Sequence, residues 1–191
     1  MRKRIRILGG TYTLSVFYTL EHYPVGMARS DSFFIRATIP TNGTTYAQQS
    51  IDLGAFVDAL GKTVMRIHNI SVVYGNPLDT PTVPVAAEGV CAFQLTTQSQ
   101  IGMIGAGNRS SISNGKLLAA GNALGELITV TESLDIAPQE WTQGYLVAVE
   151  SIFLGVDQVT VDLVDEVSVV LECTVETMTA AASMALALSQ Q

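Results

Sequence analysis

Few residues of this 191-residue chain have the types and spacing that catalysis requires. The chain contains two histidines, His22 and His68, so a site with three histidine ligands is impossible. The stretch GMIGAGN (102–108) gives Gly105-x-Gly107-x-x-Ser110, which lacks the last Gly or Ala of a dinucleotide-binding loop, and the turn-rich NRSSISNGK does not predict the helix that must follow. We therefore predict that the protein is not an enzyme and has neither catalytic residues nor a cofactor.

The acidic residues are numerous but are not spaced as a metal site. After Lys116 the chain carries eleven Asp and Glu and no Lys or Arg. Pairs such as Asp162 and Asp165, or Asp165 and Glu166, could ligate Ca²⁺ through hard oxygen atoms, yet the D-x-D-x-D-G spacing is missing. Scattered carboxylates usually form a solvated face or salt bridges, so we predict no metal site.

The two cysteines, Cys91 and Cys173, also lack a metal-binding spacing. Two buried thiols and one long-range disulfide are both compatible with the sequence. A cleaved signal peptide is not expected, because Glu21 and His22 occupy the place of the small residues at a cleavage site.

Basic residues are concentrated at the start of the chain, in MRKRIR. Four of the ten Lys and Arg are Arg2, Lys3, Arg4 and Arg6, and the remaining six oppose seventeen Asp and Glu, a difference of −11. Arginine and lysine bind phosphates with release of counterions. We predict that these four residues bind nucleic acid; a solvated terminus without function is the alternative.

The composition indicates a surface that is largely covered by other protein. Hydrophobic residues make up 48% of the chain and charged residues 14%, whereas an ordinary domain has about 25% charged residues. Such a composition is typical of a subunit with large obligate interfaces. No apolar run reaches the ~18–20 residues of a membrane-spanning helix, so no transmembrane segment is predicted.

Short β-rich runs separated by turns dominate the sequence and predict an all-β protein. Because strands and helices do not alternate, the expected fold is an eight-stranded antiparallel β-sandwich. Helical spacing predicts a short loop helix over 50–61 and a C-terminal helix over 177–188, while 75–89 and 101–125 are expected to be irregular. The strands are expected at 11–20, 32–39, 63–74, 90–98, 126–136, 144–156 and, as two strands, within 159–176.

Three parts follow from this pattern: a short basic N-terminal arm (1–10), a β-sandwich domain (11–176) and an apolar C-terminal helix or tail (177–191). This combination of basic arm, eight-stranded domain, long loops and low charge resembles the single jelly-roll coat (capsid) proteins of small icosahedral viruses.

The resemblance implies a homo-oligomeric shell in the virion, with Arg2, Lys3, Arg4 and Arg6 facing the packaged nucleic acid and no small-molecule substrate. The helix near 50–61 and the tail 177–191 are then expected to contact neighbouring subunits. The alternative is a non-enzymatic β-sandwich that binds carbohydrate or protein through loops 75–89, 101–125 or 138–145, with Trp141 and Tyr145 as an aromatic pair.

Overall fold

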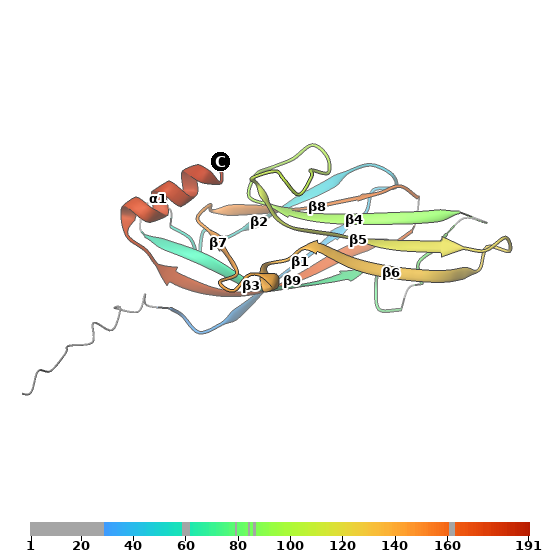
Figure 1. The fold of residues 1–191 in the computed structure, drawn as a ribbon, viewed down its shortest axis with the longest axis horizontal. Coiled ribbons are helices and arrows are strands. Elements are labelled where there is room, and N and C mark those ends of the chain that lie inside the picture. The colour runs from blue at the N-terminus through green and yellow to red at the C-terminus, as the bar shows by residue number, and fades with distance from the viewer. Residues whose placement is uncertain (1–28, 59–61, 79, 84, 86, 161–162) are drawn as a thin grey trace, which may run out of the picture.

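The computed structural model describes residues 29–58, 62–78, 80–83, 85, 87–160 and 163–191 (Figure 1). The predicted basic arm and the strand expected at 11–20 therefore lie outside the described residues. The described elements are β1 (Phe33–Pro40), β2 (Ala47–Asp52), β3 (Thr63–Tyr74), β4 (Glu88–Thr96), β5 (Ser111–Gly121), β6 (Leu127–Ile136), the 3₁₀ helix η1 (Pro138–Glu140), β7 (Tyr145–Val147), β8 (Ser151–Gln158), β9 (Glu166–Thr177) and α1 (Ala180–Ser189).

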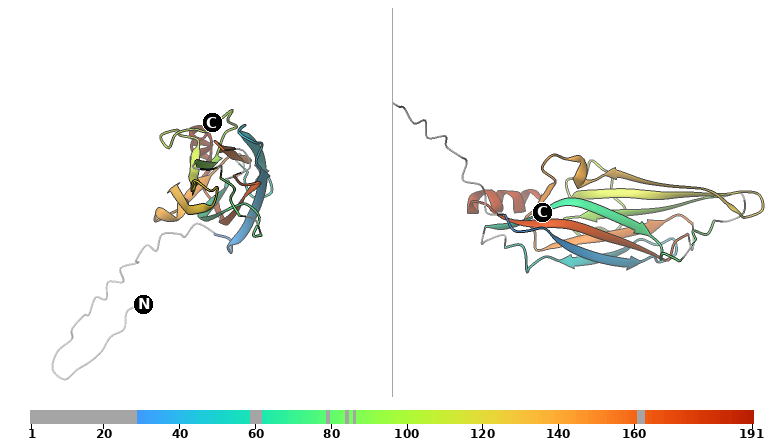
Figure 2. Two further views of the ribbon diagram at one scale, coloured as in Figure 1. Left: turned by 90° about the vertical axis from the view of Figure 1, so that its right-hand side faces the viewer. Right: turned by 90° about the horizontal axis from the view of Figure 1, so that it is seen from below.

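The strands form two antiparallel sheets packed face to face. One sheet has the order β1-β9-β3-β7 and the other the order β2-β8-β4-β5-β6. Except for β4, β5 and β6, which follow one another in one sheet, consecutive strands lie in different sheets, and strands from the beginning and end of the described chain lie side by side. This is the jelly-roll arrangement, and it confirms the predicted fold class. Figure 2 shows the two layers from the end and from below, with α1 at one end of the sandwich.

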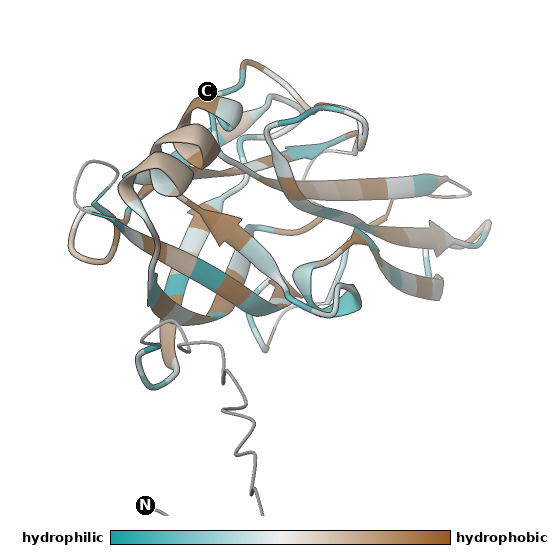
Figure 3. Ribbon diagram, turned by 60° about the vertical axis from the view of Figure 1, so that its left-hand side comes forward, coloured by the Kyte–Doolittle hydropathy of each residue, from teal (hydrophilic) through white to brown (hydrophobic). Residues whose placement is uncertain are grey.

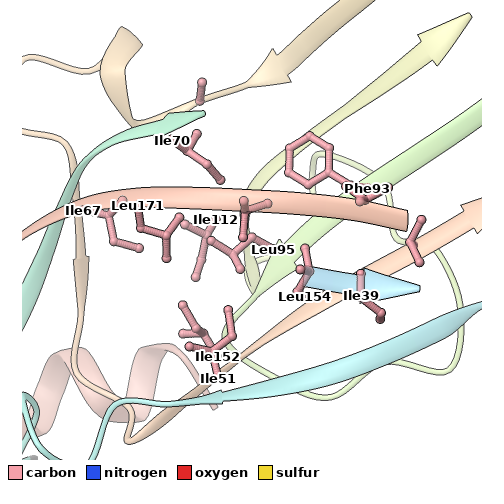
Figure 4. Packing of buried hydrophobic residues seen from close by; sticks show 14 of the residues in the cluster. Ile39, Ile51, Ile67, Ile70, Phe93, Leu95, Ile112, Ile152, Leu154 and Leu171 are labelled. Atoms are coloured by element: carbon pink, nitrogen blue, oxygen red, sulfur yellow. The ribbon is translucent and has the colours of Figure 1, made fainter. Parts of the chain in front are cut away.

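The core lies between the two sheets and is built from alternate residues of their strands. In β9, Val167, Val169, Leu171 and Cys173 are almost completely buried, as period-2 alternation predicts. Phe93, Leu95 and Leu154 face them from the other sheet, together with Ile152 (Figure 4). Cys91 and Cys173 are both buried and free, and burial raises the pKa of each thiol to about 12. They are therefore inert core residues.

The helix predicted over 50–61 is wrong. β2 occupies Ala47–Asp52 and pairs with β8, and only a single helix-like turn follows it, in which Val57 N donates to Leu53 O over 2.9 Å. Leu53 and Val57 are both buried in the core. Their four-residue spacing produced the helical pattern, and one turn is enough to bury both. The short loop helix of this fold is instead η1.

The irregular segment predicted over 101–125 is also partly wrong, because β5 occupies its second half. β5 pairs with β4 along its whole length. Gly115 is required there, since a Cβ atom would lie 2.9 Å from Cε1 of Phe93 and overlap the carbonyl oxygen of Ser133. Two other predictions change in detail: 144–156 divides into β7 and β8, and the described residues of 159–176 contain one strand, β9.

The predicted C-terminal helix is confirmed as α1. Thr179 caps its N-terminus, with Oγ1 accepting a hydrogen bond from Ala182 N over 3.3 Å. Among the described residues, no helix has both the length and the apolar character needed to cross a bilayer.

Candidate assembly surfaces

The loop between β4 and β5, residues 97–110, presents two large apolar side chains. The Ile101 side chain is fully exposed, and Met103 is partly exposed. Gln94 of β4 holds this loop: its Nε2 donates to Gly102 O over 3.0 Å, and its Oε1 accepts from Ile104 N over 2.8 Å. Because the Gln94 side chain is completely buried, its end of both bonds is shielded from water.

Gln48 of β2 holds the other side of the loop tip. Its Oε1 accepts from Gln100 N over 2.7 Å, and its Nε2 donates to Ser99 Oγ over 2.7 Å. Tyr46 joins the two glutamines, since its hydroxyl accepts from Gln94 Nε2 at 2.8 Å and donates to Gln48 Oε1 at 3.0 Å. Burial raises the pKa of Tyr46, which keeps this hydroxyl protonated. The 97–110 loop is thus fixed on both sides of Ile101.

Gly155 makes room for this network, because a Cβ atom there would overlap the Tyr46 hydroxyl and lie 2.8 Å from Cζ. We expect Gly155→Ala to displace the ring and lower the free energy of unfolding by about 1–3 kcal/mol, measured by urea denaturation. Hydrogen exchange of the Gln100 and Ile104 amides should also accelerate. Gly102→Ala is the control, since an added Cβ meets nothing within 4 Å. Equal behaviour of the two variants would contradict the role of Gly155.

The exposed face of α1 is a second apolar surface, next to this loop. Ser183 and Ala187 pack inward, Ala187 against Val64 and Ala148, whereas Met184 and Leu188 are 48% and 64% exposed. Ala181, Met184, Ala185 and Leu188 share one helix face by their spacing, and α1 carries no charged residue. The pale to brown colours along the helix in Figure 3 show this lack of hydrophilic side chains.

Gln190 joins the end of α1 to the 97–110 loop and to β7. Its carbonyl oxygen accepts from Thr97 Oγ1 over 2.8 Å. Its side chain bonds the β7 segment, accepting from Ala148 N over 2.9 Å and donating to Leu146 O over 2.6 Å. The helix end, the β7 edge and the loop base therefore form one connected unit.

Arg29, Arg66 and Glu176 form an ion cluster where the described chain begins. Arg66 bonds both carboxylate oxygens of Glu176, with Nε–Oε1 2.7 Å and Nη2–Oε2 2.8 Å, and Arg29 Nε reaches Oε1 at 2.8 Å. The hydrogen bonds from Arg66 are the largest cause of the shift in the pKa of Glu176, and those from Arg29 add to it. Together they outweigh burial, which raises this pKa, and they lower it to about 2. Ser30 N also donates to Val175 O. These contacts hold the start of the described chain against β9.

The other residues singled out in the sequence do not form a site together. Arg2, Lys3, Arg4, Arg6 and His22 lie outside the described residues. His68 bonds Thr174 Oγ1 over 2.8 Å at the sheet face, as expected of a strand residue, and burial lowers its pKa.

The glycine loop, the acidic residues and the Trp141–Tyr145 pair do not form a functional site either. Gly105 and Gly107 precede a strand and not a helix. Within the described ranges, no three His, Cys, Asp or Glu side chains gather as metal ligands would. Trp141 and Tyr145 lie 5.8 Å apart with their rings tilted by 38°, and Trp141 is exposed.

Comparisons with known proteins find similarity in structure but not in sequence. No model of a protein family matches the chain, and no curated protein matches it. Among solved structures, a chain from Desmodium yellow mottle tymovirus is similar over 92% of this chain and 95% of that chain, with 11% sequence identity and a TM-score of 0.36. The jelly-roll assignment above rests on the strand order and pairing of this chain itself.

Proposed function

We propose that this chain is a structural protein that assembles with copies of itself into a viral coat. One observation carries the proposal: a fully exposed isoleucine stands in a loop that four hydrogen bonds from Gln48 and Gln94, three of them partly buried, hold in place. Rigid apolar side chains that project into solvent are typical anchors of protein–protein contacts, because little conformational entropy is lost when they are buried.

The surface around Ile101 favours another protein as its partner. Gln190 connects the end of α1 to the base of the 97–110 loop, so two connected elements each present exposed apolar side chains: Met184 and Leu188 on α1, and Ile101 and Met103 on the loop. Groups of exposed apolar side chains mark interaction surfaces. Jelly rolls serve many functions, and the proposal therefore depends on these surfaces and not on the fold alone.

Assembly is tested by the mass of the particles in solution. Light scattering on the purified full chain should give a mass many times that of one 20.3 kDa subunit. A single species of one or two subunits, unchanged at high protein concentration and across a range of salt, would contradict the coat function.

We propose in addition that Arg2, Lys3, Arg4 and Arg6 bind the packaged nucleic acid. Four cations neutralise about four phosphates per subunit, which is weak alone but strong when many copies act together. Changing all four to Gln should lower the nucleic acid that co-purifies with particles severalfold, measured by the ratio of absorbance at 260 and 280 nm. The matched control changes four cations of the domain to Gln: Arg36, Lys62, Arg109 and Lys116. Equal loss in both variants would mean that the first residues have no special role.

A further inference from the structure

Within the described part of the chain, one edge of β6 has no partner strand. β6 is the last strand of the five-stranded sheet, and among the described residues it pairs only with β5 (Figure 1). Residues 128–132 are all exposed, so side chains on both faces of the strand meet solvent. Val130 is 42% and Ile128 63% exposed. A long exposed edge with apolar side chains is a template for pairing with another strand.

The other edge strands differ from β6. β2 has six residues, and its exposed residues Gln49, Ser50 and Asp52 are polar. β7 has three residues, and the Gln190 side chain bonds the backbone on either side of Val147. β1 carries Arg36 and ends at Pro40. By contrast, no Lys, Arg or Pro occurs between Asn122 and Ile136. Natural sheets use basic residues and proline to keep edges apart, so their absence from β6 is consistent with an edge that pairs.

The sequence of β6 suits pairing with itself. Register shifts against β5 at both ends leave Thr129–Leu134 as the regular part of the strand. We propose that two copies of this chain join β6 to β6 as antiparallel strands around a two-fold axis at Thr131. This inference rests on the proposed self-association and names one of its contacts.

No two carboxylates lie directly opposite each other in that register. Thr131 faces its own copy, and each carboxylate faces an apolar residue: Glu132 faces Val130, and Asp135 faces Leu127. Ile128 faces Leu134, so two apolar residues meet. A two-fold axis at Glu132 would place that carboxylate opposite itself, and an axis at Thr129 would place Glu126 opposite Glu132. Like charges opposite each other destabilise a sheet, which excludes these two axes. Axes at Val130 and Ser133 also avoid like charges, but they would leave Thr131 two or four positions from its copy, so the test below separates them from the proposed register.

Single cysteine variants test the register. In the proposed pairing, Thr131→Cys places two thiols on directly opposite residues, with Cα atoms about 4.5–5.5 Å apart, within the range of a disulfide. Thr129→Cys is the matched control, because Thr129 has the same residue type, face and exposure, but its copies lie four positions apart along the strands, or roughly 13 Å. Cys91 and Cys173 are buried and should not react.

Under mild oxidation of the folded full chain, Thr131→Cys should give a covalent dimer on non-reducing gels at least tenfold faster than Thr129→Cys. Equal rates, or no covalent dimer from Thr131→Cys, would overturn the pairing. Light scattering on the same samples separates this inference from the coat function. Large particles without Thr131 cross-linking would refute only the β6 contact, whereas cross-linked dimers that never exceed two subunits would support it and refute the coat.

Discussion

Replacing Ile101 with aspartate should abolish assembly and leave the β-sandwich folded. The side chain is fully exposed in the single chain, so the change removes no contact of the folded domain. At an interface it would remove about 1.5–3 kcal/mol of apolar burial and add an unpaired charge. A loss of 2 kcal/mol per contact weakens binding about 30-fold, and a shell repeats the contact in every subunit. The critical concentration for assembly, measured by light scattering, should therefore rise by at least this factor.

Two variants make the Ile101 prediction specific. Ile101→Val keeps an apolar side chain and should assemble almost as wild type. Leu78→Asp changes a side chain that is 94% exposed, but in the connection between β3 and β4, away from the Gln94 and Gln48 network. It should affect assembly far less than Ile101→Asp. If Ile101→Asp assembles normally while its circular dichroism spectrum matches that of wild type, the loop is not an anchor.

Replacing Glu176 with alanine should have the largest effect on stability, a loss of about 3–5 kcal/mol in the free energy of unfolding. Glu176 is buried and binds both Arg66 and Arg29, so its removal leaves the buried Arg66 guanidinium without its carboxylate. Glu172→Ala is the control, since Glu172 lies four residues earlier on the same strand and is only half-buried. The control should change stability by about 0.5 kcal/mol or less. Urea denaturation of both variants at pH 7 measures the difference.

The lowered pKa of Glu176 also predicts how the free energy of unfolding depends on pH. Arg66 and Arg29 lower the pKa of Glu176 from 4.5 to about 2 in the folded chain. A lowered pKa means that the unfolded chain takes up a proton first, so the stabilisation is present above pH 4.5 and is lost as the pH falls toward 2. The gap in unfolding free energy between wild type and Glu176→Ala should therefore narrow over this range. A gap that is constant from pH 7 to pH 3 would show that Glu176 acts through packing alone.

The sequence predicted the strands whose own residues favour the extended state. β3 and β9 are long and rich in Val and Ile, and the prediction gave the exact bounds of β3. β2 and β5 were missed because AQQSID and SISNGKLLAAG contain polar, small and glycine residues. Their strand conformation comes from pairing with β8 and β4, which is a tertiary effect.

The composition predicted a surface covered by other subunits, but not which residues would form it. Ile101 and Met103 stand in a glycine-rich loop, and nothing local shows that Gln94, Tyr46 and Gln48 from separate strands would fix them. Apolar residues within an otherwise polar loop were the one signal present. For β6 the strand itself was predicted, but its edge position depends on the order of the whole sheet.

Electron cryo-microscopy of the purified full chain tests the central claim most directly. Closed shells of uniform size should appear, with symmetry-related copies of this β-sandwich and with Ile101 and the exposed face of α1 buried between subunits. Single 20.3 kDa molecules, or irregular aggregates in which Ile101 and Leu188 stay in contact with solvent, would contradict it.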